Sequence, residues 1–242
     1  MENIIDPINK EVIKAELSPE RFVRHTRKGE NEIYIVDQHN APNVLQEIGR
    51  LREVTFRASG GGTGLAVDLD EFDTNEKCYQ QLIVWSPEDE EIIGGYRFAF
   101  CNKAIDSTGK IHLSTTHYFD FSERFEKEYL PYTIELGRSW VQPNFQPAIN
   151  PRKGLFALDN IWDGLGAIVK LNPQIKYFFG KVTITRSCCW IVWPSRLLGQ
   201  KGAIITGLLK ALAQIRVVDI TRDCIKMTLL LGRPSINQNI RK

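Results

Sequence analysis

A glutamate and an arginine, Glu135 and Arg138, stand three residues apart in the segment YTIELGRSWVQPNF. A carboxylate at the end of a buried strand is a candidate proton acceptor, because desolvation raises its basicity, although a neighbouring guanidinium opposes that shift. Side chains of a regular strand alternate between its two faces. These two side chains therefore share a face only if the strand bulges or bends, and Gly137 is the expected position. A catalytic pair and a structural ion pair at a strand end both fit this spacing.

Further charged residues lie upstream of this pair. Arg97 lies in the apolar run IIGGYRFAF, where a lone guanidinium is costly, so the sequence predicts a carboxylate partner for it. Candidates lie in the acidic group from Asp68 to Asp73, whose spacing lacks the glycine and distal glutamate of a calcium-binding EF-hand loop. The GGGTG run before this group fits neither a Walker A motif nor a dinucleotide fingerprint, so we expect a flexible loop over a binding cleft. The 5 cysteines and 4 histidines show no metal-ligand spacing, so no metal site is predicted.

Hydrophobic periodicity predicts the elements that must position these groups. We expect a helix over residues 43–58, a hairpin of strands over 81–85 and 92–100, a strand from 132 that breaks at Pro143, a helix over 154–171 and a strand over 177–184. The predicted buried face of the second helix consists of Leu155, Leu158, Ile161, Trp162, Leu165, Ile168 and Val169. These elements indicate a mixed α/β (α+β) domain around a mostly antiparallel sheet.

Composition and charge indicate a globular protein with an unusual tail. The chain has 242 residues, of which 43% are hydrophobic, enough for a sizeable core. No stretch reaches the roughly 18–20 apolar residues of a membrane-spanning helix, and the N-terminus does not resemble a signal peptide, so we expect a cytoplasmic protein. Residues 1–184 are acidic overall, whereas residues 185–242 carry 10 Lys and Arg against 2 Asp and Glu. We therefore divide the chain into a domain over 1–184 and an atypical basic segment over 185–242.

Two interpretations of the basic segment stand. An altered reading frame would leave the fold incomplete, and we favour this interpretation slightly. Alternatively the segment is a genuine arm in which residues 204–218 form a mostly apolar helix that rests on an anionic membrane.

Five motifs in fixed order carry a resemblance to a known family. The order LREVTFR, DEFD, GGYRF, ELGRSWVQPNF and KGLFALDNIWDGLGA resembles the hemolysin-like N-acyltransferases, which include the ornithine-lipid and glycine-lipid amino-acid N-acyltransferases. These enzymes have the acetyltransferase-type (GNAT) fold and are related to the acyl-homoserine lactone synthases. The resemblance covers roughly residues 43–184, and it rests on Arg52 with Phe56, Asp70 with Asp73, Arg97, and Glu135 with Arg138.

The resemblance implies transfer of a fatty acyl group, expected to be 3-hydroxyacyl, from acyl carrier protein to the α-amino group of glycine or ornithine. No cofactor is expected, and acyl-CoA is the less favoured donor because the acetyl-CoA signature of the fold is degraded to NPRKGLFA. Glu135 would remove the proton of the amine, with Arg138 beside it as the second catalytic residue. The implied substrate-binding residues are Arg52, Phe56, Asp70, Asp73, Arg97 and Trp140, and Arg152 and Lys153 would form part of a basic docking patch for the acidic carrier protein.

Two alternatives remain. A signal synthase that makes an acyl-homoserine lactone is disfavoured, because SGGG stands where that family places an aromatic residue. A non-catalytic protein could instead use the basic tail to bind a membrane or nucleic acid. For the favoured acyltransferase we expect an amino-acid substrate and peripheral contact with the inner face of the membrane, and no nucleic-acid partner.

Overall fold

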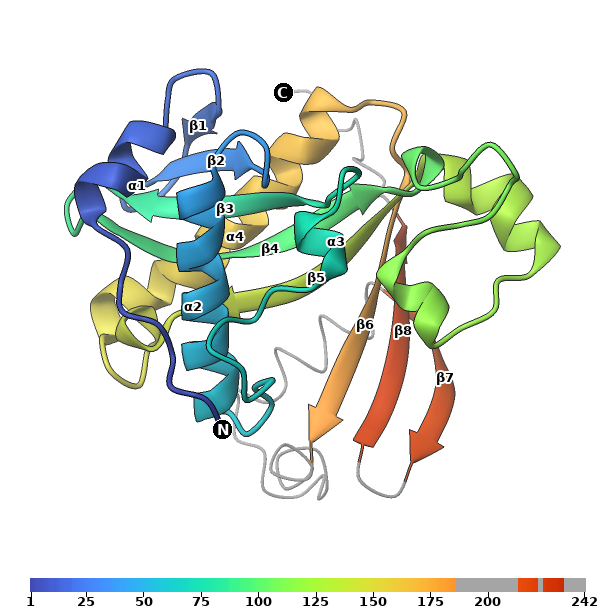
Figure 1. Ribbon diagram of the computed structural model, residues 1–242. Coiled ribbons are helices and arrows are strands. Elements are labelled where there is room, and N and C mark those ends of the chain that lie inside the picture. The colour runs from blue at the N-terminus through green and yellow to red at the C-terminus, as the bar shows by residue number, and fades with distance from the viewer. Residues whose placement is uncertain (186–212, 222–223, 233–242) are drawn as a thin grey trace, which may run out of the picture. The chain divides into compact units, whose positions relative to one another are not determined.

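The structure is a computed structural model that describes residues 1–185, 213–221 and 224–232 (Figure 1). The contacts within the chain define two compact units. The first unit comprises Met1–Ala99, Lys103–Ser114 and Leu136–Pro173, and the second comprises Phe100–Asn102, Thr115–Glu135 and the described part of Gln174–Lys242.

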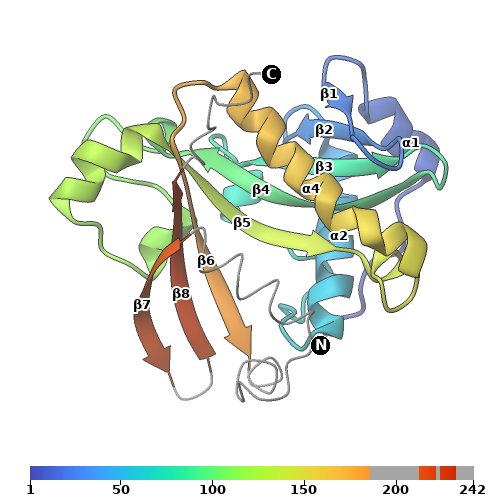
Figure 2. The same ribbon diagram turned by 180° about the vertical axis from the view of Figure 1, so that it is seen from behind.

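The first unit contains a sheet with helices on both faces. Its elements are α1 (Lys10–Glu16), β1 (Phe22–His25), β2 (Glu32–Val36), α2 (Pro42–Ala58), α3 (Glu71–Thr74), β3 (Gln80–Ser86), β4 (Glu91–Phe100), β5 (Thr133–Val141) and α4 (Pro151–Leu171). The end of β4 and the first three residues of β5 belong to the second unit. The strands follow the order β1-β2-β3-β4-β5, and the first four pair antiparallel. Helix α2 covers one face of these strands (Figure 1) and α4 covers the other (Figure 2). The predicted mixed α/β class with a mostly antiparallel sheet is confirmed.

Helix α2 follows the predicted helical spacing closely. Pro42 occupies its first position, where the missing N–H costs no hydrogen bond. Val44, Ile48 and Leu51 lie on one side of the helix and enter a core cluster with residues of β2, β3, β4 and β5. The helix ends at Ala58, Ser59 caps it, and Gly60 follows with a φ of 76°, a backbone conformation that glycine adopts without strain. Burial of this apolar face places the remaining α2 side chains, including Arg52, at defined positions over the sheet.

The predicted buried face of α4 is wrong in part. Three of its members are exposed at the surface: Leu155 at 66%, Leu158 at 58% and Trp162 at 42%. Small residues face the sheet in their place, because a Cβ added at Gly164 would lie 2.5 Å from Leu82 Cδ2. The helix therefore approaches the sheet more closely than large side chains would permit.

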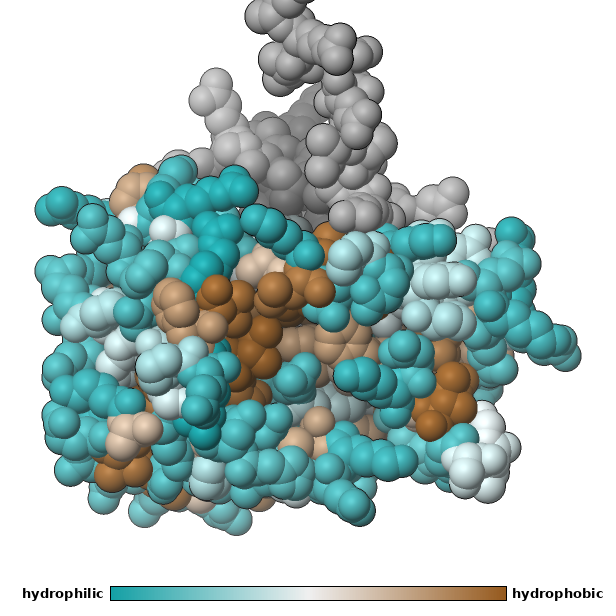
Figure 3. Space-filling view, turned by 90° about the horizontal axis from the view of Figure 1, so that it is seen from above, coloured by the Kyte–Doolittle hydropathy of each residue, from teal (hydrophilic) through white to brown (hydrophobic). Residues whose placement is uncertain are grey.

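Figure 3, a view from above, shows hydrophobic surface gathered in a few areas among mostly hydrophilic residues.

The described part of the second unit contains three strands and a series of short helical turns. The strands β6 (Tyr177–Thr185), β7 (Ala213–Thr221) and β8 (Cys224–Gly232) follow the order β6-β8-β7, and both pairs are antiparallel. The predicted helix over 204–218 is wrong over residues 213–218, which lie in β7, and residues 204–212 lie outside the described residues. The segment AQIRVVDIT is rich in β-branched residues, which favour a strand over a helix.

None of the helices within the described residues combines the length and hydropathy needed to cross a bilayer.

Candidate functional site

Three arginines, three aspartates and one glutamine of the first unit form one connected group, which we call the arginine–aspartate cluster. It gathers side chains from α2, from the segment around α3, and from β3, β4 and β5. Its members are Arg52, Asp68, Asp70, Asp73, Gln81, Arg97 and Arg138.

The inner part of the cluster is buried. Arg52 Nη1 lies 3.1 Å from Asp73 Oδ2, and Arg52 Nη2 donates to Gln81 Oε1 at 2.6 Å. Gln81 in turn donates to Asp73 Oδ1, and Arg97 donates to Asp73 Oδ2. The side chains of Arg52 and Asp73 have no exposed surface. Burial lowers the pKa of Arg52, and the carboxylate of Asp73 opposes this shift. A pair of buried charges with this many hydrogen bonds forms a fixed framework.

The outer part of the cluster reaches the surface. The side chains of Asp70 and Arg138 are each 30% exposed, and they contact one another at 3.3 Å. Arg97 Nη1 donates to Asp70 Oδ1 at 2.6 Å. Burial alone would raise the pKa of Asp70, but Arg97 and Arg138 together lower it to about 2. For Arg97 the order is reversed: burial would lower its pKa, and Asp73 and Asp70 raise it above its ordinary range. The cluster thus presents one carboxylate and one guanidinium to solvent.

Asp68 joins the cluster, although sequence reasoning did not select it as a site residue. Its side chain is buried, and Arg138 Nη1 lies 3.3 Å from Asp68 Oδ1. This contact is an ion pair without the geometry of a hydrogen bond, and neither carboxylate oxygen of Asp68 has a hydrogen-bond partner. Burial raises the pKa of Asp68, and Arg138 opposes the shift. Asp68 stands two residues before Asp70 in the sequence, but nothing in that spacing marks it as buried beside Arg138.

Asp70 and Asp73 also stabilise the start of α3. Asp70 caps α3 by accepting a hydrogen bond from Phe72 N, and Asp73 Oδ2 accepts one from Asp70 N, which completes a capping box. Arg97 also lies over the rings of Phe72 and Tyr79, at 5.8 and 5.2 Å. The same two aspartates therefore fix α3 and hold Arg97 in place.

Strand β5 carries both Glu135 and Arg138. The predicted irregularity occurs one residue later than expected, because Arg138 itself has a φ of 50°. Arg138 forms ion pairs with Asp68 and Asp70. Glu135 belongs to the second unit, where its side chain is buried and Oε1 accepts a hydrogen bond from Thr115 N at 3.0 Å.

Other residues selected from the sequence occupy more ordinary positions. Trp140 is buried in the core cluster between the sheet and α2, and Phe56 packs against the same cluster. Arg152 is exposed at the start of α4. Lys153 forms a salt bridge with Asp89, which raises the pKa of Lys153. These positions give Trp140 and Lys153 a structural role in the first unit.

The GGGTG loop is anchored to α2 through Glu53. Glu53 accepts hydrogen bonds from the backbone and hydroxyl of Thr63 at 2.9 and 2.7 Å, and from Gly64 N at 2.9 Å. Burial alone would raise the pKa of Glu53, but these bonds and one from Arg57 lower it to about 2. A Cβ at Gly62 would come within 2.8 Å of Glu53 Oε1. The glycines here allow close packing around a buried carboxylate.

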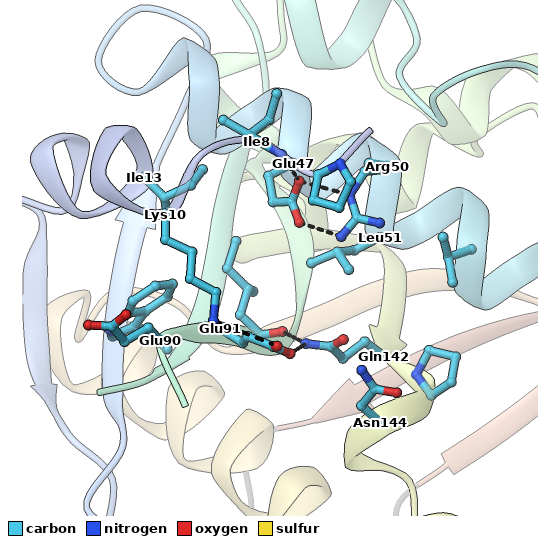
Figure 4. Close-up of a pocket in the computed structure, with 15 residues that line it drawn as sticks. Ile8, Lys10, Ile13, Glu47, Arg50, Leu51, Glu90, Glu91, Gln142 and Asn144 are labelled. Carbon is cyan, nitrogen blue, oxygen red and sulfur yellow. Dashed lines mark hydrogen bonds and ion pairs between the residues drawn. The ribbon is translucent and has the colours of Figure 1, made fainter. Parts of the chain in front are cut away.

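A pocket of about 390 Å³ lies in the first unit between the N-terminal segment, α2, the β3–β4 turn and the end of β5 (Figure 4). Two sets of interacting polar side chains face one another across it. One is Glu47 with Arg50, and the other is Glu91 with Lys10 and Gln142. The described part of the chain holds no group of three or more His, Cys, Asp or Glu side chains placed to bind a metal ion.

Residues 51–150 match the family described as acetyltransferase (GNAT) domain. The match covers 100 of the 242 residues and runs from within α2 to the residue before α4.

Two relatives match a larger part of the chain than the family does. One is a glycine N(alpha)-acyltransferase of Phocaeicola vulgatus, 57% identical over 185 residues, a match that covers 76% of this chain and 57% of the relative. The other is a glycine N(alpha)-acyltransferase of Bacteroides thetaiotaomicron, 58% identical over 185 residues, covering 76% of this chain and 55% of the relative. The chain thus spans a little over half the length of these relatives.

The fold also resembles solved structures of low sequence identity. One is the CoA-dependent acyl-homoserine lactone synthase BjaI, solved with MTA, which matches this chain with a TM-score of 0.48 and 12% identity over 84% of each chain. FeeM, an N-acyl amino acid synthase from uncultured soil microbes, has a TM-score of 0.44 and 11% identity, and the match covers 85% of this chain and 92% of FeeM.

Proposed function

We propose that this protein is an N-acyltransferase that moves a fatty acyl group, in particular a 3-hydroxyacyl group, from acyl carrier protein to the α-amino group of glycine. The identity of 57% and 58% over 185 residues to two glycine N(alpha)-acyltransferases carries this proposal. The sequence alone left glycine and ornithine equal as acceptors. Both relatives are named for glycine, which favours glycine.

The proposed reaction is complete with its two substrates. The amine nitrogen of glycine attacks the thioester carbonyl, so that a C–N bond forms and the C–S bond breaks. The thiol of the carrier leaves with a proton, and the amine loses its proton to a base. No oxidant, reductant or cofactor enters this balance. An acyl carrier protein donor fits a cytoplasmic site of action, and an N-acylated glycine, which has a long apolar chain, fits release at the inner face of the membrane.

In this proposal the outer part of the arginine–aspartate cluster holds the acceptor. Glycine carries one carboxylate and one ammonium group, and Arg138 and Asp70 are the partly exposed guanidinium and carboxylate of the cluster. A guanidinium binds a carboxylate through two parallel hydrogen bonds, so Arg138 suits the carboxylate of glycine. Arg52, Asp73 and Arg97 would position these two side chains, because they are buried and Asp73 accepts hydrogen bonds from both arginines.

Glu135 is the proposed proton acceptor, three residues before Arg138 in β5. Its buried carboxylate is fixed by the hydrogen bond from Thr115 N. Backbone N–H groups near the irregular part of β5 are the proposed donors to the oxyanion that forms on the thioester carbonyl. Arg152, exposed at the start of α4, remains the proposed contact for the acidic carrier protein.

The test is mass spectrometry of the product made by purified protein from acyl carrier protein thioesters and glycine, repeated on lipids of cells that express the chain. We expect N-acylglycine from the full chain and a rate roughly 100- to 10,000-fold lower from Glu135→Gln, the range of general-base catalysis. Glu128→Gln, at an exposed glutamate paired with Arg124, is the matched control and should keep the full rate.

Absence of an acylated product from folded protein with every donor and acceptor tried would overturn the proposal. An acyl-homoserine lactone as the product would make the protein a signal synthase instead. A Glu135→Gln variant as active as Glu128→Gln would leave the reaction intact and remove Glu135 from its proposed role.

A further inference from the structure

Helix α4 exposes large apolar side chains on its outer face, the side turned away from the sheet (Figure 2). Leu155, Leu158 and Trp162 are exposed at 66%, 58% and 42%, and their spacing of three and four residues places them in one row along the helix. Single exposed apolar residues are common on protein surfaces, whereas a contiguous row that includes a tryptophan is typical of a surface that binds a partner. The residues beside this row indicate which partner fits.

The outer face also contains a carboxylate and an open space. Asp159 stands next to Leu158, and its side chain is 58% exposed. It pairs with Lys28 at 3.2 Å, but Lys28 is 57% exposed, and an ion pair this open contributes little and exchanges readily. Gly166 follows Trp162 by about one turn, and a Cβ added there would meet nothing within 4 Å. A complementary partner would offer a cation to Asp159 and a large side chain to the space over Gly166, and an anionic lipid surface offers neither.

Helix α4 itself carries both of these groups. Lys170 is exposed near the end of the helix and forms no ion pair within the described residues. It lies 11 residues after Asp159, about three helical turns, so the two side chains occupy the same edge of the outer face. Trp162 is the large side chain, in the middle of the row. The outer face therefore has the features that a second copy of itself would recognise.

One register of an antiparallel helix pair brings these groups together. In a pair related by a two-fold axis, like edges of the two helices face each other, and every contact occurs twice. A register that places Trp162 of one copy over Gly166 of the other also places Asp159 opposite Lys170, to within one residue or about 1.5 Å along the helix. The large side chain then fills the open space, and the opposite charges meet at the edge of the contact.

We propose that two copies of this chain associate through the outer face of α4 as an antiparallel dimer with two-fold symmetry. In this register Leu158 faces the half-buried Val169 of the second copy. The helix of the second copy ends opposite Ala157, so Arg152 and Leu155 stay uncovered, and Arg152 remains accessible as the proposed contact for the carrier protein. The dimer does not depend on the proposed function. A single pair of helices makes a small interface, so we expect reversible association.

Charge reversal tests the register. Sedimentation equilibrium over about a hundredfold range of protein concentration should show the mass rising from that of one chain toward that of two. Asp159→Lys and Lys170→Asp each place like charges opposite one another twice, so each should raise the Kd of the dimer roughly tenfold, and the double variant should restore it. Lys110→Asp is the matched control, because it changes the net charge as Lys170→Asp does at an exposed position outside α4. Circular dichroism establishes that each variant folds.

Gly166→Gln tests the fit of the tryptophan. The added side chain meets nothing within one chain, and glutamine favours a helix more than glycine does, so dilute protein should keep or raise its Tm. The same side chain occupies the space that Trp162 of the second copy would fill, so the dimer should be lost.

A wild type that stays monomeric throughout the concentration range would overturn the proposal. A dimer that survives Gly166→Gln and both single charge reversals would overturn it as well, and so would a double variant without recovery. Binding of a monomeric wild type to phosphatidylglycerol vesicles, lost in Trp162→Ala, would make the outer face a membrane contact instead. None of these outcomes depends on whether the chain transfers acyl groups.

Discussion

Replacement of Asp73 by asparagine should reveal how much the buried part of the arginine–aspartate cluster contributes to stability. Asp73→Asn keeps the size of the side chain, so it opens no cavity. Within the described residues, it removes the carboxylate that forms an ion pair with Arg52 at 3.1 Å, and one of the two carboxylates that pair with Arg97. Arg52 has no exposed surface and would be left as a buried cation without its counter-charge.

The expected cost follows from that burial. Breaking a buried ion pair by removing one partner typically costs about 3–5 kcal/mol, because the remaining charge loses its compensation. For a chain of this size each kcal/mol lowers Tm by about 2–4 °C, so Tm should fall by roughly 6–20 °C. That loss is a large share of the about 5–15 kcal/mol by which native proteins are stable.

Asp70→Asn is the matched control. Its carboxylate is 30% exposed, water can replace part of its interaction, and asparagine caps a helix as well as aspartate does. We expect a smaller loss, about 1–2 kcal/mol. A third variant that combines Asp73→Asn with Arg52→Met removes both partners, and its loss should be smaller than the sum of the single changes.

Urea unfolding followed by circular dichroism measures these differences as shifts in the midpoint at constant slope. The reasoning is refuted if Asp73→Asn loses no more stability than Asp70→Asn, or if the double variant shows simple additivity. Either result would mean that Arg52 is not held by Asp73 in a water-free site.

Three further predictions concern local packing. The pKa of Glu53 in the folded protein is about 2, so its hydrogen bonds to the GGGTG loop should be fully present above about pH 4.5 and lost as the pH falls toward 2. Protection of the Thr63 amide from hydrogen exchange should follow that course, whereas Glu53→Gln should show low protection at every pH. Gly166→Ala should stabilise α4 by about 1 kcal/mol, because nothing lies within 4 Å of the added Cβ. Gly164→Ala should instead lower Tm, because its Cβ would lie 2.5 Å from a buried leucine. Equal changes in Tm for the two variants would contradict the close approach of α4 to the sheet. Gly94→Ala should prevent proper pairing of β4 with β5, because its Cβ would lie 2.4 Å from a backbone carbonyl oxygen, and a normal Tm for this variant would count against that contact.

Local patterns in the sequence determined most of the elements. Helix α2, the β3–β4 hairpin, β5, α4 and β6 all lie within a few residues of their predicted bounds. Their apolar residues recur with the period of a helix or strand, and turn residues separate them. The resemblance to amino-acid N-acyltransferases was also visible in the sequence, because it rests on motif residues that occur in a fixed order.

The sequence also predicted that Arg97 needs a carboxylate, because an unpaired buried guanidinium is costly. It did not predict which carboxylate, since the acidic group from Asp68 to Asp73 offered several candidates. Nor did it single out Asp68 within that group or find Gln81. Gln81 reaches the cluster because the hairpin register places it opposite Arg97, and register is a property of two strands together.

The tertiary structure alone decided which face of α4 is buried and where the pocket lies. Leu155, Leu158 and Trp162 have the helical spacing of a core face, yet Gly164 and its small neighbours meet the sheet, because close approach of the helix excludes large side chains. The pocket is lined by residues as far apart in sequence as Lys10 and Asn144. Sequence periodicity records which residues within an element share a face. The distances between elements, which set every ion pair and cavity in this protein, depend on how those faces pack together.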